Sequence, residues 1–257
     1  PKLYRMKTLT TILVLLTLML GTHTISAQTV DEIIDTYFEN TGGKENWEAV
    51  EALTFKGTLD YGGMNLPVTM VQTKEGLTML SAEVQGQPFY QTVYDGETLW
   101  NTNQQTFEAE MNDAEATENY KLGIQDFPDP FLNYKEKGYK VELIGNETIE
   151  GTETFKVKLE KKPKLVNGVE EPNVEYYYFE KENYVPILVE KQVAIGPEGT
   201  SMGQSKLSDY QEVDGLYFPF SMIDGTKDFP NAQSITITKV EVNPEIDPAM
   251  FQFPKKN

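Results

Sequence analysis

The sequence predicts an α+β fold that is mainly β, built on a strongly curved or nearly closed antiparallel sheet. Three observations predict it. Helical spacing is confined to the start and the middle of the chain, apolar and polar residues alternate with a period of two over many short segments, and turn signals separate these segments at even intervals. No repeat and no linker divides residues 28–257, so we expect them to form one domain.

The first 27 residues have the pattern of a secretory signal peptide. Lys2, Arg5 and Lys7 form a positive start, and Leu9–Leu20 is a largely apolar stretch of 12 residues, shorter than the roughly 20 that a membrane span needs. Small and polar residues follow and end at Ala27. We therefore expect export to the periplasm with cleavage after Ala27.

A helix is predicted directly after this leader. Thr29 and Glu32 have the spacing of a capping box, and Gly42 and Gly43 supply a stop. Between these signals the apolar residues recur at helical spacing, namely Val30, Ile33, Ile34, Tyr37 and Phe38. A second, short helical turn is expected around Trp47.

Strands are predicted wherever the period changes to two. The segments are 53–61, 66–70, 77–84, 88–94, 99–100, 139–143, 155–159, 174–179, 185–195, 207–213, 216–223 and 235–242. Residues 104–130 break the pattern, so we expect one or two helices to interrupt the sheet there, followed by a short packed turn at 131–134. Lys161–Pro172 is predicted to be a loop.

The composition excludes several classes of function. The chain has 22 basic and 40 acidic residues, and removing residues 1–27 takes away three basic ones, which leaves 19 against 40 and a net charge of −21. The single histidine, His23, and the single arginine, Arg5, leave with the leader, and there is no cysteine. Histidine-based relays, the common zinc sites, thiolate chemistry and arginine clamps are thereby excluded, and the charge repels nucleic acid.

The acidic residues give no recognisable catalytic or metal site. With 40 of them, a glycosidase-like carboxylate pair stays open as an enzyme hypothesis, but a solvated acidic surface is the better interpretation. The acidic run from Glu108 to Glu118 lacks the spacing of a calcium loop. We therefore predict no catalytic residue, no metal and no cofactor, and the chain is not expected to be an enzyme.

Aromatic residues and methionines are more informative. Tyr176, Tyr177 and Tyr178 place rings on both faces of one strand, where they either pack in the core or stack on a sugar. Met64, Met70 and Met79 fall in neighbouring strands, and methionine suits both plain core filling and a surface that accepts apolar ligands of varying shape. An apolar pocket between a curved sheet and its helices fits this pattern better than a catalytic site.

Five segments resemble the LolA/LolB-like superfamily of periplasmic lipoprotein carriers, especially the group from Bacteroidetes-type bacteria labelled outer membrane lipoprotein-sorting proteins. They cover nearly the whole mature chain and consist of turn and packing residues. The segments are Tyr37–Trp47, Tyr94–Trp100, Tyr134–Gly145, Ser208–Phe220 and Met250–Pro254.

The resemblance implies an unclosed barrel whose concave face is covered by helices, with acyl chains of lipids or lipoproteins bound inside and the helices acting as a lid. Two features depart from the family. Gln28 follows Ala27 where the outer-membrane acceptor type needs a cysteine, which favours a soluble carrier. The mature chain also lacks the cavity arginine that holds the known carriers closed.

We therefore predict a soluble, monomeric periplasmic carrier that binds lipid or lipoprotein acyl chains for transport towards the outer membrane, with envelope transport proteins as further partners and no membrane-spanning segment. Alternation and position select the residues expected to line the lipid cavity, namely Leu59, Met70, Met79, Tyr90, Trp100 and Met111. The alternative is an extracytoplasmic scaffold that binds polysaccharide or an envelope protein through an exposed row of Tyr176, Tyr178 and Tyr184.

Overall fold

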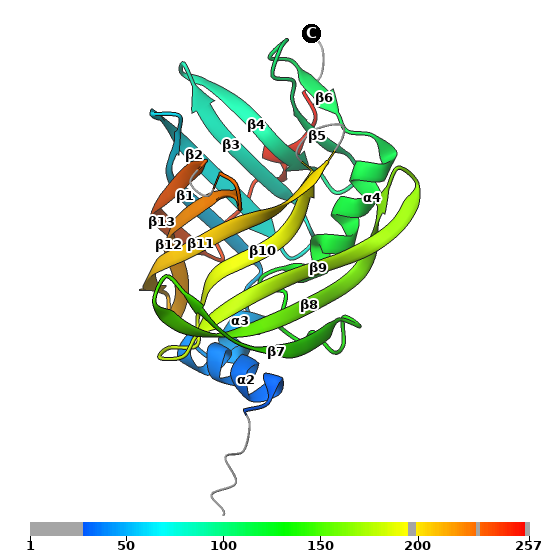
Figure 1. Cartoon of the computed structure of the whole chain (residues 1–257). Coiled ribbons are helices and arrows are strands. Elements are labelled where there is room, and N and C mark those ends of the chain that lie inside the picture. Colours follow the sequence, from blue (N-terminus) through cyan, green and yellow to red (C-terminus); the bar gives the residue numbers. More distant parts are fainter. Residues whose placement is uncertain (1–27, 195–198, 230–231, 255–257) are drawn as a thin grey trace, which may run out of the picture.

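The computed structural model describes residues 28–194, 199–229 and 232–254, so the predicted signal peptide lies outside the described residues. Thirteen strands within these ranges form one antiparallel sheet in the order β6-β5-β4-β3-β2-β1-β13-β12-β11-β10-β9-β8-β7 (Figure 1). The strands are β1 (Ala52–Tyr61), β2 (Met64–Thr73), β3 (Thr78–Val84), β4 (Gln87–Tyr94), β5 (Leu99–Thr102), β6 (Ala109–Met111), β7 (Lys140–Ile149), β8 (Thr152–Val166), β9 (Val169–Glu180), β10 (Pro186–Ala194), β11 (Thr200–Val213), β12 (Leu216–Thr226) and β13 (Gln233–Val242). The helices are α2 (Val30–Asn40), α3 (Lys44–Glu48) and α4 (Ala114–Gly123), with short 3-10 turns η1 (Ile124–Asp126) and η2 (Pro248–Phe251).

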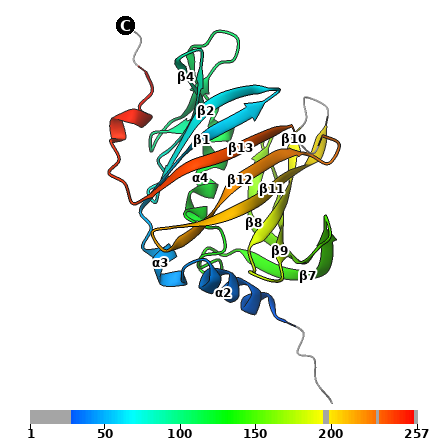
Figure 2. The same ribbon diagram turned by 90° about the vertical axis from the view of Figure 1, so that its left-hand side faces the viewer.

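The sheet curves until its two halves face each other, and α4 lies within the curve (Figures 1 and 2). Bulges contribute to this shape because each one increases the local twist. One lies at Lys56/Gly57, where β13 approaches so closely that a Cβ on Gly57 would sit 2.3 Å from the carbonyl oxygen of Thr236. The outermost strands β6 and β7 do not pair with each other. The prediction of a mainly β fold with a curved, unclosed sheet and helices on its concave face is confirmed.

The two N-terminal helices pack at one end of the curved sheet (Figure 2). The predicted capping box is present: Glu32 N donates to Thr29 Oγ1 at 3.3 Å, and Thr29 N donates to Glu32 Oε2 at 2.7 Å. The apolar stripe of α2 and Trp47 of α3 enter the largest core cluster, where the Trp47 ring meets Phe218 of β12 at 5.3 Å. Helix α2 thus forms where its sequence signals predict it, and its burial holds it there.

The predicted helical interruption lies between β6 and β7. Helix α4 begins at its cap Asp113, whose side chain accepts from Ala116 N at 2.7 Å, and it continues into η1. The chain then turns through Phe131, which is 2% exposed and packs between the rings of Tyr177 and Phe179. The short strand β6 within 104–130 has no counterpart in the prediction, because three residues are too few to show alternation.

The loop predicted at Lys161–Pro172 is wrong, since β8 and β9 continue through it to a tight turn at Asn167 and Gly168. Contacts with α4 stabilise this extension. Asn119 exchanges two hydrogen bonds with the backbone of Leu165, and the Glu115 carboxylate accepts from Asn167 N and Gly168 N at 2.9 and 2.6 Å. These contacts join residues about fifty positions apart, and a local pattern does not contain them.

Residues after β13 pack against the outer face of the β1–β5 half (Figure 2). Phe251 is fully buried against Trp100, whose indole Nε1 donates to the Phe251 carbonyl oxygen at 2.9 Å. Phe253 meets the Trp100 ring at 5.8 Å. A second core cluster therefore lies on the face opposite to the one that the helices cover. Among the described residues, no helix has the length and apolar character to cross a membrane.

Candidate functional site

An apolar belt crosses the concave face of the sheet. Its five members stand directly opposite one another on five adjacent strands, because the registers of β11, β12, β13, β1 and β2 align them. They are Leu207, Met222, Ile235, Leu59 and Leu66. Met222 shares its face of β12 with Phe218, which packs against the helices, so the belt lies on the helix-covered side.

The belt is only partly covered by the rest of the chain. Leu59 is 7% exposed, whereas the other four side chains are half-buried. A sheet face packed solidly against helices would bury such residues completely. The concave face therefore retains apolar surface beyond the part that α2 and α3 fill.

The structure has two open grooves of interest, the first of which lies beside the belt. One has a volume of about 350 Å³ and runs over β9 to β12, with Tyr177, Val189, Val193, Gly203 and Asp224 in its lining. The second has a volume of about 340 Å³ and lies between the β2–β3 turn and the α4–η1 segment. Both linings mix apolar with polar residues, whereas the sequence predicts an apolar cavity.

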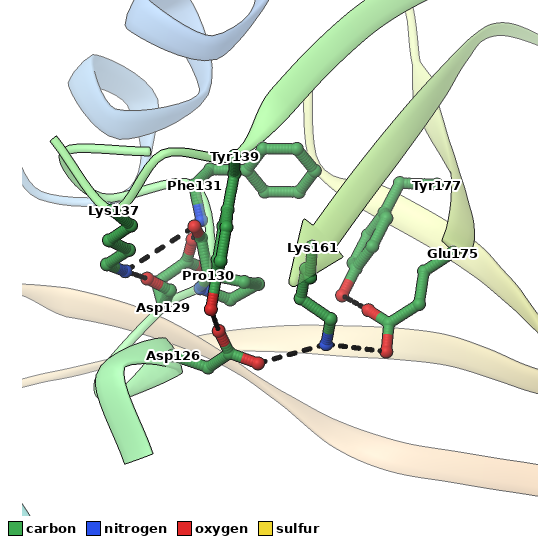
Figure 3. A network of polar contacts seen from close by, with 9 residues as sticks. All are labelled: Asp126, Asp129, Pro130, Phe131, Lys137, Tyr139, Lys161, Glu175 and Tyr177. Atoms are coloured by element: carbon green, nitrogen blue, oxygen red, sulfur yellow. Dashed lines mark hydrogen bonds and ion pairs between the residues drawn. The ribbon is translucent and has the colours of Figure 1, made fainter. Parts of the chain in front are cut away.

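A buried ion-pair network fastens the helical segment to the sheet (Figure 3). Lys161 Nζ of β8 lies 2.9 Å from Asp126 Oδ2 of η1 and 2.8 Å from Glu175 Oε1 of β9. The three side chains are only 11%, 23% and 12% exposed, respectively. Tyr139 donates to Asp126 at 2.5 Å and Tyr177 donates to Glu175 at 2.8 Å, so each carboxylate has a second donor. We call Lys161, Asp126 and Glu175 the lysine clasp.

Lys161 and Glu175 of the clasp both have pKa values that favour their charged forms. Burial lowers the pKa of Lys161, but the negative charges of Glu175 and Asp126 outweigh it and the net pKa is raised. Burial likewise raises the pKa of Glu175, yet the positive charge and hydrogen bond of Lys161 leave it below its ordinary value. Pairing thus favours the charged forms of Lys161 and Glu175 over their neutral forms.

A second polar centre connects α2 to the same segment. The Asp129 carboxylate accepts from the Tyr37 hydroxyl at 2.8 Å and from the backbone N–H of Phe131 at 2.8 Å. Lys137 Nζ donates to the backbone carbonyls of Asp129 and Pro130 (Figure 3). Burial raises the pKa of the Asp129 carboxyl, and it raises that of the Tyr37 phenol well above its usual range. Residues 126–139 are thus tied both to the sheet and to α2.

Replacing Tyr37 with phenylalanine should destabilise the protein by about 1–3 kcal/mol at pH 8, because Asp129 loses a buried hydrogen-bond donor. The pKa of Asp129 is already raised, so its ionised form is the disfavoured one in the fold, and the variant should lose stability as the pH rises through that pKa. Urea unfolding at pH 3, below the ordinary value of 3.8, and at pH 8 measures this. A loss that is the same at both pH values would argue against the buried carboxylate as its cause.

The six residues predicted to line a lipid cavity fall into three places. Leu59 and Met70 lie on the concave face, since Met70 stands opposite Phe55 and Leu80. Three others point to the outer face and pack with the C-terminal residues, namely Met79, Tyr90 and Trp100. Met111 is 56% exposed on the edge strand β6. The structure therefore does not bring the six together, and their contact with lipid stays a prediction.

Alternation separates the two faces of a strand but does not identify the concave one. The outer face of β3 to β5 is as apolar as an interior because the C-terminal segment covers it. The clasp and the Tyr37–Asp129 pair have no counterpart in the prediction either. The available signal was weak: Asp126 and Asp129 flank the Phe127-Pro128 break in an otherwise apolar turn.

The tyrosines of the alternative function do not form an exposed row. Tyr178 is 1% exposed, and its hydroxyl donates to Glu190 at 2.6 Å. Lys156 Nζ lies over the rings of Tyr176 and Tyr178, at 5.3 and 5.0 Å from their centroids. Tyr184 is half-buried and packs on the Phe155 ring. Two of these tyrosine rings thus contact a lysine and the third packs against the core, so the three do not form an open binding surface.

The sequence matches no protein-family model and no curated protein. Solved structures match the fold over 86–88% of this chain. A DUF1329 family protein from Desulfovibrio piger is 11% identical with a TM-score of 0.55, and a LolA superfamily protein from Nitrosomonas europaea is 11% identical with a TM-score of 0.52; each is covered over 98% of its length. A domain described as outer membrane lipoprotein-sorting, from Vibrio parahaemolyticus, is 10% identical over 94% of its length with a TM-score of 0.51. The curved sheet, its helical covering and these matches show that the chain has a LolA/LolB-like fold.

Proposed function

We propose that this chain is a carrier that binds acyl chains of lipids or lipoproteins against the apolar belt and moves them through water without making or breaking a bond. The observation that carries the proposal is the belt itself, five aligned apolar side chains of which four are only half-buried on a concave face. The match to a domain described as lipoprotein-sorting supports the same class of cargo.

The grooves suggest how cargo enters. At about 350 and 340 Å³ each is at the small end of ligand sites, which span roughly 300–1,000 Å³. A long acyl chain needs more room, so we propose that the segment of residues 114–139 moves away from the sheet as a lid. The lysine clasp would then hold the lid shut, which is the task that the missing arginine has in the known carriers.

The proposed setting is the periplasm, reached through the signal peptide in residues 1–27, with residues 28–257 acting as one monomeric domain. A strongly acidic surface keeps such a carrier dissolved and apart from other acidic macromolecules. Transport towards the outer membrane and the participation of envelope transport proteins are part of the same proposal.

Lipid that co-purifies with the full chain tests the proposal. The chain is expressed with its leader in a bacterium with two membranes, purified from the periplasm without detergent and examined by native mass spectrometry. We expect bound lipid in the unaltered protein. Val189→Trp places a large ring in the groove of β9 to β12 and should lower lipid occupancy about tenfold, which corresponds to about 1.4 kcal/mol.

Gln192→Trp is the matched control, because Gln192 is exposed on β10 and is absent from the groove lining. It adds the same ring without filling the groove and should leave the lipid content unchanged. Protein that carries no lipid in any preparation would contradict the carrier proposal. Equal losses of bound lipid in the two tryptophan variants would show that the lipid does not bind in this groove.

A further inference from the structure

Hairpin turns lie along one rim of the curved sheet. Each strand is antiparallel to its neighbours, so the turns β1–β2, β3–β4, β5–β6 and β8–β9 and the described start of the β12–β13 turn fall at the same ends of the strands. Helices α2 and α3 lie at the opposite rim, where Tyr217 N, just after the β11–β12 turn, donates to Thr41 O at 3.1 Å. Figure 2 shows the β1–β2 hairpin at the far end of the molecule from α2 and α3. We call the first set of turns the hairpin rim.

Large apolar side chains project from four turns of the hairpin rim. Phe229 is 74% exposed, Phe107 64%, Val169 62%, Met64 55% and Tyr61 54%. Among the described residues, Met111 of β6, at 56%, is the only other large apolar residue that is exposed as much as these five. The most exposed large apolar side chains of the described residues thus gather on one rim of the sheet.

The two phenylalanines are held in position by their turns. Phe107 has a φ of +57°, a conformation that is costly for a bulky residue. Its N–H donates to Asn103 O at 2.9 Å, and its ring meets Phe89 at 6.0 Å. In the β12–β13 turn, Thr226 N and Phe229 N donate to each other's carbonyl oxygens at 2.9 and 3.0 Å. Each phenylalanine therefore stands in a segment held by backbone hydrogen bonds.

The charge of these turns differs from that of the whole protein. Residues 60–65, 103–108, 166–169 and 226–229 together contain one lysine and three acidic residues. The remaining polar residues there are mostly glycine, asparagine, glutamine and threonine. Nearly all of the net charge of −21 thus lies elsewhere, and an uncharged lipid surface can approach this rim without strong repulsion.

We propose that the hairpin rim docks on a bilayer of zwitterionic lipid. Aromatic side chains favour the depth of the lipid headgroups, where their rings leave water while polar neighbours stay hydrated. The anchors stand on separate turns with polar residues between them. A fluid lipid surface accepts such separate anchors, whereas a protein partner needs a contiguous apolar patch.

Docking in this orientation would bring the groove of β9 to β12 to the membrane. Asp224 in its lining lies two residues before Thr226, the last residue of β12, and Gly203, also in the lining, pairs with Thr226. This inference goes beyond the carrier function and rests on different residues. It gives a route by which an acyl chain would pass between bilayer and groove without crossing open water.

Vesicle flotation tests the proposal with the mature protein, residues 28–257. Vesicles of phosphatidylcholine and phosphatidylethanolamine are compared with vesicles that also contain about a third phosphatidylglycerol. We expect binding to the zwitterionic vesicles and weaker binding to the anionic ones, because the protein is acidic. The double variant Phe107→Ser/Phe229→Ser should reduce binding to zwitterionic vesicles at least about tenfold.

Ile144→Ser/Met250→Ser is the control, since both residues are exposed and lie outside the hairpin rim. It should change vesicle binding by less than about twofold, a difference well within RT. Absence of binding by the unaltered protein, equal losses in the two double variants, or binding to anionic vesicles alone would overturn the proposal. Self-association that depends on the two phenylalanines, without vesicle binding, would show that the hairpin rim binds a second copy of the chain. That result would also overturn the proposal.

Two further measurements separate this proposal from the carrier function. Circular dichroism melting shows whether the serine variants fold. Binding of a short-chain phospholipid, added below its critical micelle concentration and without vesicles, should be unchanged in Phe107→Ser/Phe229→Ser, because neither residue lines a groove. Protein that binds vesicles but never carries lipid would support the docking surface and contradict only the carrier function.

Discussion

Replacing Lys161 with methionine should lower the free energy of unfolding by about 3–5 kcal/mol at pH 7, the usual loss when one partner of a buried ion pair is removed. The variant leaves Asp126 and Glu175 buried without the ammonium group that contacts both carboxylates. Urea unfolding measures the loss. Lys161→Arg keeps the charge and should recover most of the stability.

Lys74→Met is the matched control, because Lys74 makes an equally short contact of 2.6 Å with Glu51, but the two side chains are 52% and 58% exposed. Its loss should stay below about 1 kcal/mol, since solvent screens such a pair. If both lysine variants lose the same small amount, the clasp does not fasten the helical segment.

The pH dependence of the free energy of unfolding gives a second test of the Lys161→Met variant. The pKa of Glu175 is lowered in the fold, so its contribution to stability is present above the ordinary value of 4.5 and is lost as the pH falls through the lowered pKa. The pKa of Lys161 is raised, so its contribution is present below 10.5 and is lost at still higher pH. The difference between the unaltered protein and Lys161→Met should therefore be largest between these limits and shrink in acid.

Gly42→Ala should destabilise the protein by at least about 4 kcal/mol, the range that marks a severe local conflict. Gly42 has a φ of +118°, and a Cβ there would lie 2.1 Å from the carbonyl oxygen of Gly215. That turn cannot withdraw easily, since Tyr217 N donates to Thr41 O at 3.1 Å directly beside it. Thermal unfolding followed by circular dichroism measures the effect.

Gly63→Ala is the control that separates the effect of the steric clash from the cost of placing an alanine at a positive φ. Gly63 also has a positive φ, +83°, but no atom lies within 4 Å of the Cβ position. It should lower the free energy of unfolding by only about 1–2 kcal/mol, the cost of holding a non-glycine residue in the left-handed conformation. Similar losses at both glycines would mean that the turn of β11–β12 is free to move, and that the N-terminal helices are held less firmly than the contacts indicate.

Local pattern predicts most of this fold. Helix α2 carries its own start, stripe and stop, and the strands carry their own alternation. The extension of β8 and β9 escapes prediction because Glu115 and Asn119 of α4 complete its hydrogen bonds from a distant part of the chain. Similarly, alternation predicts that Trp100 lines the cavity, whereas in the structure Trp100 lies on the outer face and Phe251 covers it.

The candidate site is predicted less well, since it depends on register across distant strands. Leu59 is recognisable as an inward residue from alternation alone. Its alignment with Ile235, and through it with Met222, depends on β1 pairing with β13, which joins the two ends of the chain. The clasp requires that Asp126 return to the sheet beside Lys161 and Glu175, and nothing in the spacing of these residues requires it.

The chain contains two tryptophans, and the sheet separates them. Trp47 lies in the helix-covered cluster and Trp100 in the outer cluster under the C-terminal residues. The protein therefore carries two intrinsic fluorophores in environments that do not share a core. With one replaced by phenylalanine at a time, emission from Trp47 follows events on the concave side, and emission from Trp100 follows the detachment of the C-terminal segment, in the same molecule and without an added label.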